Sequence, residues 1–142
     1  IQVLFGMVRE RDKQEIEYMK EDPLTGQAIG GAFEVANELG CGFLEKVYEN
    51  ALVVALKEKN LRVESQSGLT VHYHNVCVGS YYADLIVEDR LIIEVKAVET
   101  LRGEHVAQVL NYLRATGIKT GLLVNFGKPR LQYRRFDNRF LQ

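Results

Sequence analysis

The sequence has few cysteines and no long apolar run, and both absences narrow its class. Among 142 residues there are only two cysteines, Cys41 and Cys77. They lie in different expected elements, and no cysteine or histidine accompanies them at the spacing of a zinc site, so we expect both to be reduced and structural. No apolar stretch approaches the roughly 18 residues of a membrane-spanning helix, and no secretion signal is recognisable. The expected location is therefore the cytoplasm, with no membrane association.

The sequence also lacks a large net charge of either sign. The formal net charge is −1 at pH 7, from 18 basic and 19 acidic residues. This balance excludes a protein that binds nucleic acid through overall positive charge, so any such binding must come from a local patch. Residues 128–139, KPRLQYRRFDNR, contain five basic residues and one acidic residue. The candidate contacts to nucleic acid in this segment are Lys128, Arg130, Arg134 and Arg135.

The length predicts one compact domain with its own core. The first six residues, IQVLFG, resemble a rhinoviral-protease site left by an expression tag, with Met7 as the expected natural start. Mixed charges with little apolar periodicity follow. We therefore expect a tag remnant and charged lead-in over residues 1–22, and a single domain over residues 23–142.

Two helices are expected at the start of this domain. Asp22 and Pro23 supply an N-cap and a first-turn proline, and apolar residues then recur at helical spacing until Gly40. Glycines around residue 41 break the chain before a second helix, expected from Phe43 to about Asn60.

Strand patterns follow the helices. Short β-rich runs at 62–66, 69–74, 78–87 and 91–97 predict a meander of antiparallel strands. Helical spacing returns over 103–115, and two further strands are expected at 121–126 and 131–136. The order predicts an α+β fold in which a mixed β-sheet is flanked by helices.

The segment 83–96, ADLIVEDRLIIEVK, places charged side chains in an apolar context. A turn centred near Asp89 would put Asp84 opposite Glu94, with Lys96 on the same strand face as Glu94. Two adjacent carboxylates repel each other, so a cation has to compensate. A structural ion pair with Lys96 is one possibility. The other is a divalent ion such as Mg²⁺, beside which Lys96 would orient or activate a water for phosphodiester hydrolysis.

Two helical sets add candidates to this centre. Glu45 and Tyr48 share one face of the second helix, so Glu45 could supply a further carboxylate. His105, Gln108 and Tyr112 form a polar stripe on the third helix. Gln108 could hold a phosphate or a metal-bound water, and Tyr112 could hydrogen-bond or stack nearby. The alternative for both sets is an ordinary solvent-facing position.

Four motifs in order give the chain, from about Leu24 to Asp137, a resemblance to the GxxExxY protein family, which is assigned to the PD-(D/E)XK nuclease superfamily. The naming motif matches Gly42, Glu45 and Tyr48. ADLIVEDRLIIEVKAVE resembles the superfamily core motif, with Asp84 and Glu94-Val95-Lys96. QVLNY is similar to the QxxxY element of the RecB-like branch, and GLLVNFGKPRLQYRR also resembles the family.

The resemblance implies a restriction-endonuclease-like αβββαβ core with the acids on its central strands. It implies that Asp84, Glu94 and the Val95 carbonyl bind Mg²⁺ or Mn²⁺, with Glu45 as a further candidate ligand. In this scheme Lys96 positions or activates the attacking water, Gln108 and Tyr112 support the site, and hydrolysis leaves 5′-phosphate ends. Tyr48 joins the basic residues as a candidate contact to nucleic acid.

The first functional hypothesis is therefore a small metal-dependent nuclease that acts on DNA. A second is a catalytically silent module that keeps this fold to bind nucleic acid or a protein partner. In that case the charged hairpin is an ion-pair network, and Arg134 and Arg135 carry the binding. A third is a regulatory or oligomerisation subunit with no role in nucleic-acid chemistry.

Overall fold

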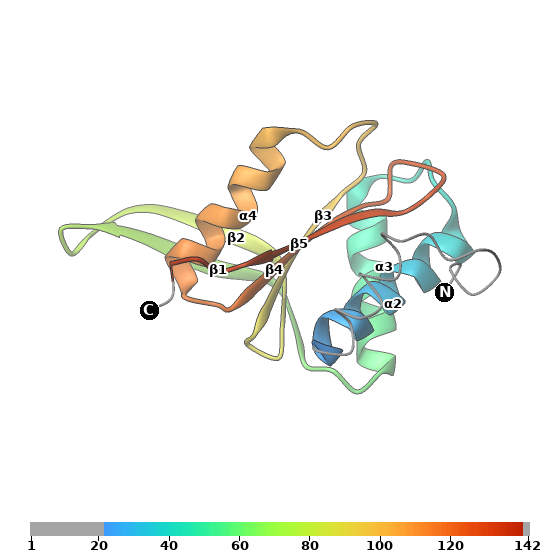
Figure 1. Ribbon diagram of the computed structural model, residues 1–142, viewed down its shortest axis with the longest axis horizontal. Helices are drawn as coiled ribbons and strands as arrows, with labels where there is room; N and C mark the ends of the chain where they lie inside the picture. Colours follow the sequence, from blue (N-terminus) through green and yellow to red (C-terminus); the bar gives the residue numbers. More distant parts are fainter. Residues whose placement is uncertain (1–21, 141–142) are drawn as a thin grey trace.

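The computed structural model describes residues 22–140, so the tag remnant and most of the lead-in expected over residues 1–22 lie outside the described residues. The described chain alternates between helices and a sheet (Figure 1). Its elements in order are α2 (Pro23–Leu39), α3 (Glu45–Glu58), β1 (Val63–Tyr73), β2 (Val76–Val87), β3 (Leu91–Lys96), α4 (Gly103–Thr116), β4 (Thr120–Asn125) and β5 (Gln132–Asp137).

The five strands form one mixed sheet in the order β1-β2-β3-β4-β5. All neighbours are antiparallel except β3 and β4, which are parallel because α4 carries the chain back between them. Helices α2 and α3 pack on one face and α4 packs on the other, each over its own apolar cluster (Figure 1). The predicted α+β architecture with an αβββαβ order, here from α3 to β4, is confirmed; α2 and β5 extend it.

The helix ends follow the expected local chemistry, with one shift. Asp22 is the N-cap of α2, where its side chain accepts a hydrogen bond of 3.2 Å from the Thr25 backbone N–H, and Pro23 follows. Helix α2 ends at Leu39 because Gly40 adopts a φ of 68°, which favours glycine. Helix α3 is shorter than the predicted 43–60, because the chain before Glu45 is held in a loop.

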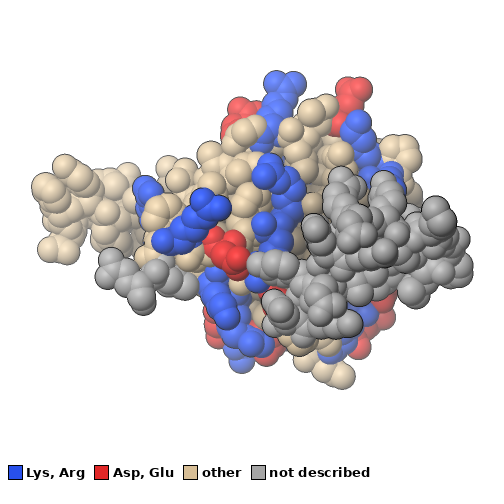
Figure 2. Space-filling model, viewed as in Figure 1, with Lys and Arg blue, Asp and Glu red and all other residues tan. Residues whose placement is uncertain are grey.

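The strands predicted at 62–66 and 69–74 are in fact one continuous strand, β1. Ser67 and Gly68, at the expected break, pair with Ala83 and Tyr82 of β2. The hairpin turns through His74 and Asn75, whose positive φ values of 49° and 65° are those of a two-residue turn matched to strand twist. This ribbon extends away from the helices as the arm in Figure 1, and it is free of charge in Figure 2, because residues 65–83 contain no Lys, Arg, Asp or Glu.

The close packing of α4 on the sheet depends on Gly121. A Cβ added at this glycine would lie 2.6 Å from Cγ1 of Val109 and 3.1 Å from Cδ1 of Leu113, so any larger residue would push α4 outward. This contact fixes the height of α4 above β3 and β4. The polar residues of α4 therefore approach the sheet at a defined distance.

Two expectations drawn from composition have different outcomes. Cys41 and Cys77 are free thiols, but both are exposed, so the expectation that they are structural is wrong. Cys41 lies in the loop before α3 and Cys77 lies on the projecting ribbon, where neither can pack in the core. Among residues 22–140, no helix combines the length and apolarity that crossing a bilayer requires.

Candidate active site

The two acids of the β2–β3 hairpin lie side by side, as the expected turn centre predicts. The turn is centred on Asp89, with Val87 opposite Leu91 and Leu85 opposite Ile93. Beyond Leu85 and Ile93, the two strands are joined by side-chain hydrogen bonds in place of backbone pairing. The Asp84 N–H donates to Oε1 of Glu94 at 3.1 Å, and the Val95 N–H donates to Oδ2 of Asp84 at 2.8 Å.

Strand β2 changes direction at this point. Ala83 and Ile86 both belong to the core cluster beneath α4, whereas Leu85 belongs to the cluster on the opposite face. Strict alternation would place residues 83 and 86 on opposite faces. The interruption falls at Asp84, where β2 separates from β3 and runs out into the ribbon. This divergence opens the space in which the two carboxylates meet.

Glu94 is the most strongly perturbed of the site residues. Its side chain is only 1% exposed, and burial, together with the charge of Asp84, raises its pKa to about 9. The hydrogen bond from the Asp84 backbone and the charge of Lys96 oppose this rise without reversing it. In the absence of a cation, Glu94 therefore keeps a proton at neutral pH.

This donor set fits a hard divalent cation. A neighbouring cation favours the ionised carboxylate, which opposes the burial and the repulsion that now hold a proton on Glu94. Within the part of the chain that the structure describes, no three acidic, histidine or cysteine side chains are assembled as a metal site. Mg²⁺ does not require such a cage, because it keeps several waters and binds through one or two carboxylates. Asp84, Glu94 and the Val95 carbonyl offer that kind of partial, all-oxygen set.

Glu45 is the first residue of α3 and is an exposed residue whose carboxyl is partly desolvated. Burial raises its pKa, and the charge of Asp84 raises it further, while Lys96 and a hydrogen bond from the Ala97 backbone lower it. These influences place the Glu45 carboxyl within electrostatic reach of both Asp84 and Lys96. The helical spacing predicts a further carboxylate at this centre, and the charges of Asp84 and Lys96 both act on the Glu45 carboxyl.

Lys96 ends β3 on the same side as Glu94 and is half-buried. Its positive charge lowers the pKa of both Glu94 and Glu45. Within residues 22–140, however, no salt bridge to Lys96 is formed. A lysine bound as a structural ion pair would be expected to touch an acid directly. The ammonium is instead available to a ligand at the site.

Helix α4 brings two of its three predicted polar residues to the acids. Tyr112 is 7% exposed, and burial, aided by the charges of Glu94 and Asp84, raises the pKa of its hydroxyl. Gln108 Nε2 donates to the Tyr112 hydroxyl at 3.1 Å. The third residue, His105, instead accepts a hydrogen bond of 2.9 Å from the Arg102 N–H at the start of the helix.

Tyr48 is completely buried, so the expectation that it contacts nucleic acid is wrong. Its hydroxyl donates to the Gly40 carbonyl at 2.6 Å and accepts from the Phe43 N–H at 3.1 Å. Its ring stacks on Phe126, with centroids 4.8 Å apart. Tyr48 thus holds the loop before α3 against the core, and this loop positions Glu45 at the helix start.

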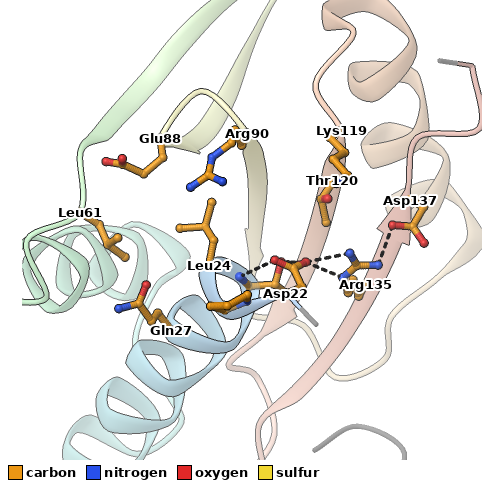
Figure 3. A pocket seen from close by; sticks show the side chains of 12 residues that line it. Asp22, Leu24, Gln27, Leu61, Glu88, Arg90, Lys119, Thr120, Arg135 and Asp137 are labelled. Atoms are coloured by element: carbon orange, nitrogen blue, oxygen red, sulfur yellow. Dashed lines mark hydrogen bonds and ion pairs between the residues drawn. The ribbon is translucent and has the colours of Figure 1, made fainter. Parts of the chain in front are cut away.

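The basic segment does not form one patch, because β5 places alternate residues on opposite faces of the sheet. Arg135 lies on the α2 side, where it donates to Asp22 at 3.0 and 2.7 Å and to Asp137 at 2.7 Å (Figure 3). Arg134 lies on the α4 side, exposed, with its guanidinium 5.2 Å from the Phe136 ring centroid. The structure therefore separates Arg134 from Arg135, and the binding of nucleic acid by either arginine stays a prediction.

Lys128 and Arg130 follow the end of β4, beside the end of β3 that carries Lys96. Because Lys96 pairs with Asn125 at the end of β4, the following loop, with Lys128 and Arg130, emerges at the edge of the sheet where Lys96 lies. Arg134 is in the same cross-strand row as Glu94, with Leu123 between them. At normal strand spacing this row puts the β3 and β5 backbones roughly 10 Å apart.

The hollow in Figure 3 lies at the opposite edge of the sheet. Its volume is about 570 Å³, and it is bordered by the start of α2, the turn before β3 and the start of β4. Both cations and carboxylates line it, among them Asp22, Glu88, Arg90, Lys119 and Arg135. Because the paired acids lie near the other end of β3, this hollow is not part of the candidate active site.

Three polar residues near the site have no distinctive sequence pattern: Glu49, Gln66 and Asn125. Asn125 is fully buried, and its amide clamps the chain that follows Lys96: its Oδ1 accepts from the Val98 N–H at 2.9 Å, and its Nδ2 donates to the Val98 carbonyl at 2.9 Å. Glu49 could have been found from its position one helical turn after Glu45. Nothing in the strand pattern marks Gln66, whose contacts depend on the folded chain.

Comparison with known proteins agrees with this geometry. The family model of the PD-(D/E)XK nuclease superfamily matches residues 21–136. A solved structure described as "Crystal structure of SSO0001" is similar in fold, with a TM-score of 0.51 and 18% sequence identity over 96% of this chain and 72% of that chain. This likeness is consistent with the restriction-endonuclease-like fold. A search of curated proteins gives no significant match.

Proposed function

Because the chain belongs to the PD-(D/E)XK nuclease superfamily, we propose that it is a cytoplasmic nuclease that hydrolyses phosphodiester bonds, in DNA in particular, with Mg²⁺ or Mn²⁺. One observation carries the proposal. The Glu94 carboxyl accepts from the backbone of β2, and the Asp84 carboxylate accepts from the backbone of β3. Glu94 is buried, and its pKa is raised to about 9. An acid held protonated by burial and by a neighbouring acid is unfavourable for stability alone, and it suits a site completed by a cation.

Within the superfamily, we assign the chain to the GxxExxY branch. The support is the physical sense of the motif spacing in this fold. Tyr48 anchors the loop that contains Gly42, and Glu45 then begins α3 beside Lys96. The three motif residues therefore have one shared consequence, which is the placement of the Glu45 carboxyl.

The proposed mechanism assigns separate tasks to the residues. Asp84, Glu94 and the Val95 carbonyl, with Glu45 beside them, would hold the cation. When bound, such an ion supplies Lewis acidity at the phosphate and lowers the pKa of nearby water. Lys96 donates a hydrogen bond that orients the attacking water or stabilises charge on a phosphoryl oxygen. Water oxygen bonds to phosphorus, the P–O3′ bond breaks, and the 3′ oxygen takes up a proton, so the product carries a 5′-phosphate. Gln108 and the Tyr112 hydroxyl keep this side of the site polar.

The direct test is cleavage of labelled single- and double-stranded DNA and RNA in the presence of Mg²⁺ or Mn²⁺. We expect wild-type protein to produce 5′-phosphate ends with DNA, and Asp84→Asn to lower the rate by at least about 10²-fold, because the carboxylate charge on the cation is lost. Asp89→Asn is the matched control: it makes the same change in the exposed turn of the same hairpin. Absence of cleavage by the wild type across the whole panel would contradict the proposal.

A second candidate function is nucleic-acid binding without cleavage. The observation that favours it is the position of three basic residues: Arg134 is exposed on the face that carries Glu94, and Lys128 and Arg130 follow β4 at the same edge. A polynucleotide at the candidate site could contact all three. Such contacts would support either a nuclease or a silent module, so cleavage and binding have to be measured separately.

The two adjacent arginines are expected to behave differently on substitution. In EDTA, Arg134→Gln should weaken DNA binding and reduce the slope of log affinity against log salt concentration by about 0.9, which corresponds to one lost phosphate contact. Arg135→Gln should leave the slope unchanged and lower the free energy of unfolding by about 1–3 kcal/mol, because Asp22 loses its partner. Fluorescence anisotropy at several salt concentrations and thermal denaturation give the two quantities. Equal effects of both variants on the slope would contradict this division.

A further inference from the structure

Gln66 has an unusual backbone for a residue inside a strand. Its φ is +52°, in the left-handed region that residues other than glycine, asparagine and aspartate seldom adopt. The strand pairing does not slip at this position, since Ser65 faces Leu85 and Ser67 faces Ala83 on either side. Gln66 therefore lies directly opposite Asp84 in a distorted conformation. Such strain persists where surrounding contacts maintain it, and it is concentrated at functional sites.

The side chain of Gln66 links two carboxylates. Its Nε2 donates to Oε1 of Glu49 at 2.6 Å and lies 3.4 Å from Oδ1 of Asp84. Glu49 is 3% exposed, and its other oxygen is bound by Lys46. Because an ionised carboxylate only accepts hydrogen bonds, the NH₂ group of the amide must face both acids. A continuous polar chain thus runs from Lys46 on α3 to Asp84 on β2.

The Gln66 amide approaches one particular oxygen of the Asp84 carboxylate, Oδ1. Oδ2 already accepts from the Val95 N–H at 2.8 Å, so Oδ1 is the oxygen with more capacity left for a cation. The Gln66 amide is near Oδ1, but at 3.4 Å it is longer than a normal hydrogen bond. The amide can thus restrict the rotation of the Asp84 carboxylate without saturating Oδ1.

We propose that Gln66 is a positioning residue for the metal-binding carboxylate of Asp84, and that Glu49 anchors the Gln66 amide. This inference rests on the proposed metal-dependent function and adds two residues to it. A residue that orients a metal ligand commonly changes metal affinity by about 10- to 100-fold when it is removed. The competing explanation is that Gln66 only ties β1 to α3. That explanation predicts a change in stability and none in metal affinity.

Variants at position 66 separate these explanations. Gln66→Ala and Gln66→Gly both remove the amide, but glycine also accepts the positive φ without strain. We expect Gln66→Gly to be more thermostable than Gln66→Ala, and both to bind Mn²⁺ about tenfold more weakly than the wild type. Mn²⁺ alone is the probe, followed by electron paramagnetic resonance of the free ion. The matched control is Ser67→Ala on the same strand, whose hydroxyl contacts Glu64, and it should retain wild-type affinity.

A double-mutant cycle tests the anchoring role of Glu49. Glu49→Gln should weaken Mn²⁺ binding in the wild-type background and have little effect in Gln66→Ala, because its influence passes through the amide. Equal effects in both backgrounds would overturn that role. The positioning of Asp84 would be overturned if Gln66→Ala and Gln66→Gly bound Mn²⁺ as tightly as Ser67→Ala.

The outcomes also distinguish this inference from the proposed function. A wild-type protein that binds Mn²⁺ but cleaves no substrate would contradict nuclease activity, while a tenfold loss of affinity in Gln66→Ala would still support positioning. A wild-type protein that binds no Mn²⁺ would overturn both. Cleavage by the wild type with unchanged Mn²⁺ affinity in both Gln66 variants would overturn the positioning role alone.

Discussion

Lys96→Ala is expected to lower kcat for phosphodiester cleavage by about 10²- to 10⁴-fold, the range for loss of a group that acts in the transition state. Metal affinity should change much less. Lys96 influences Glu94 and Glu45 through its charge, but within residues 22–140 it forms no salt bridge. Its ammonium is thus free to contact water or phosphate, and its removal should act on chemistry more than on ion binding.

The measurement is single-turnover cleavage at saturating Mn²⁺, with Mn²⁺ affinity determined separately. Lys119→Ala, at the opposite edge of the sheet beside the hollow of Figure 3, is the control that removes a lysine without reaching the site. A Lys96→Ala protein with an undiminished rate would leave the proposed catalytic role of the lysine without support. Loss of folding, monitored by circular dichroism, would instead favour the structural ion-pair explanation.

Glu94→Gln is expected to make the metal-free protein more stable at pH 8 and to remove most of its stabilisation by Mg²⁺. The pKa of Glu94 is raised from 4.5 to about 9, mainly by burial and then by Asp84. Between these values the folded chain holds a proton that the unfolded chain releases, so the stability of the metal-free wild type is fully present below pH 4.5 and falls as the pH rises towards 9. At pH 7 the loss from this group is at most about 3 kcal/mol.

Thermal denaturation between pH 5 and pH 9, with EDTA or with excess Mg²⁺, measures both effects. Glutamine keeps an oxygen for the Asp84 N–H and has no proton to lose, so the pH dependence in EDTA should be flatter than in the wild type. Wild-type protein should also release a proton when Mg²⁺ binds, because the ion favours ionised Glu94. Identical pH profiles of the two proteins in EDTA would show that Glu94 is not held protonated in the fold.

The local elements were largely predictable because short-range chemistry decides them. The N-cap at Asp22 and the glycine that ends α2 follow from backbone geometry, and their positions were correct. The turn centred on Asp89 set the register of β2 and β3, so the meeting of Asp84 and Glu94 could be derived from counting residues. Helical spacing was enough to direct Glu45 and Tyr112 towards this centre.

Other features required the folded chain. Ser67 and Gly68 read as a break between two strands, but pairing with β2 supplies the hydrogen bonds that keep β1 continuous. Tyr48 is a polar aromatic in an otherwise exposed motif, and only packing against Phe126 and the loop before α3 decides that it is buried. A sequence pattern reports neighbours along the chain, whereas these outcomes depend on neighbours across space.

By itself, the sequence determined the order of the elements, which implied a mixed sheet, and the adjacency of two acids and a lysine, since these depend on local periodicity and on contacts within one hairpin. Tertiary structure alone decided that Arg135 is bound by Asp22 and that Gln66 meets Asp84 and Glu49. The physical reason is that these relations join α2, α3 and the sheet. Their side chains meet only after long-range packing has fixed the distance between those elements.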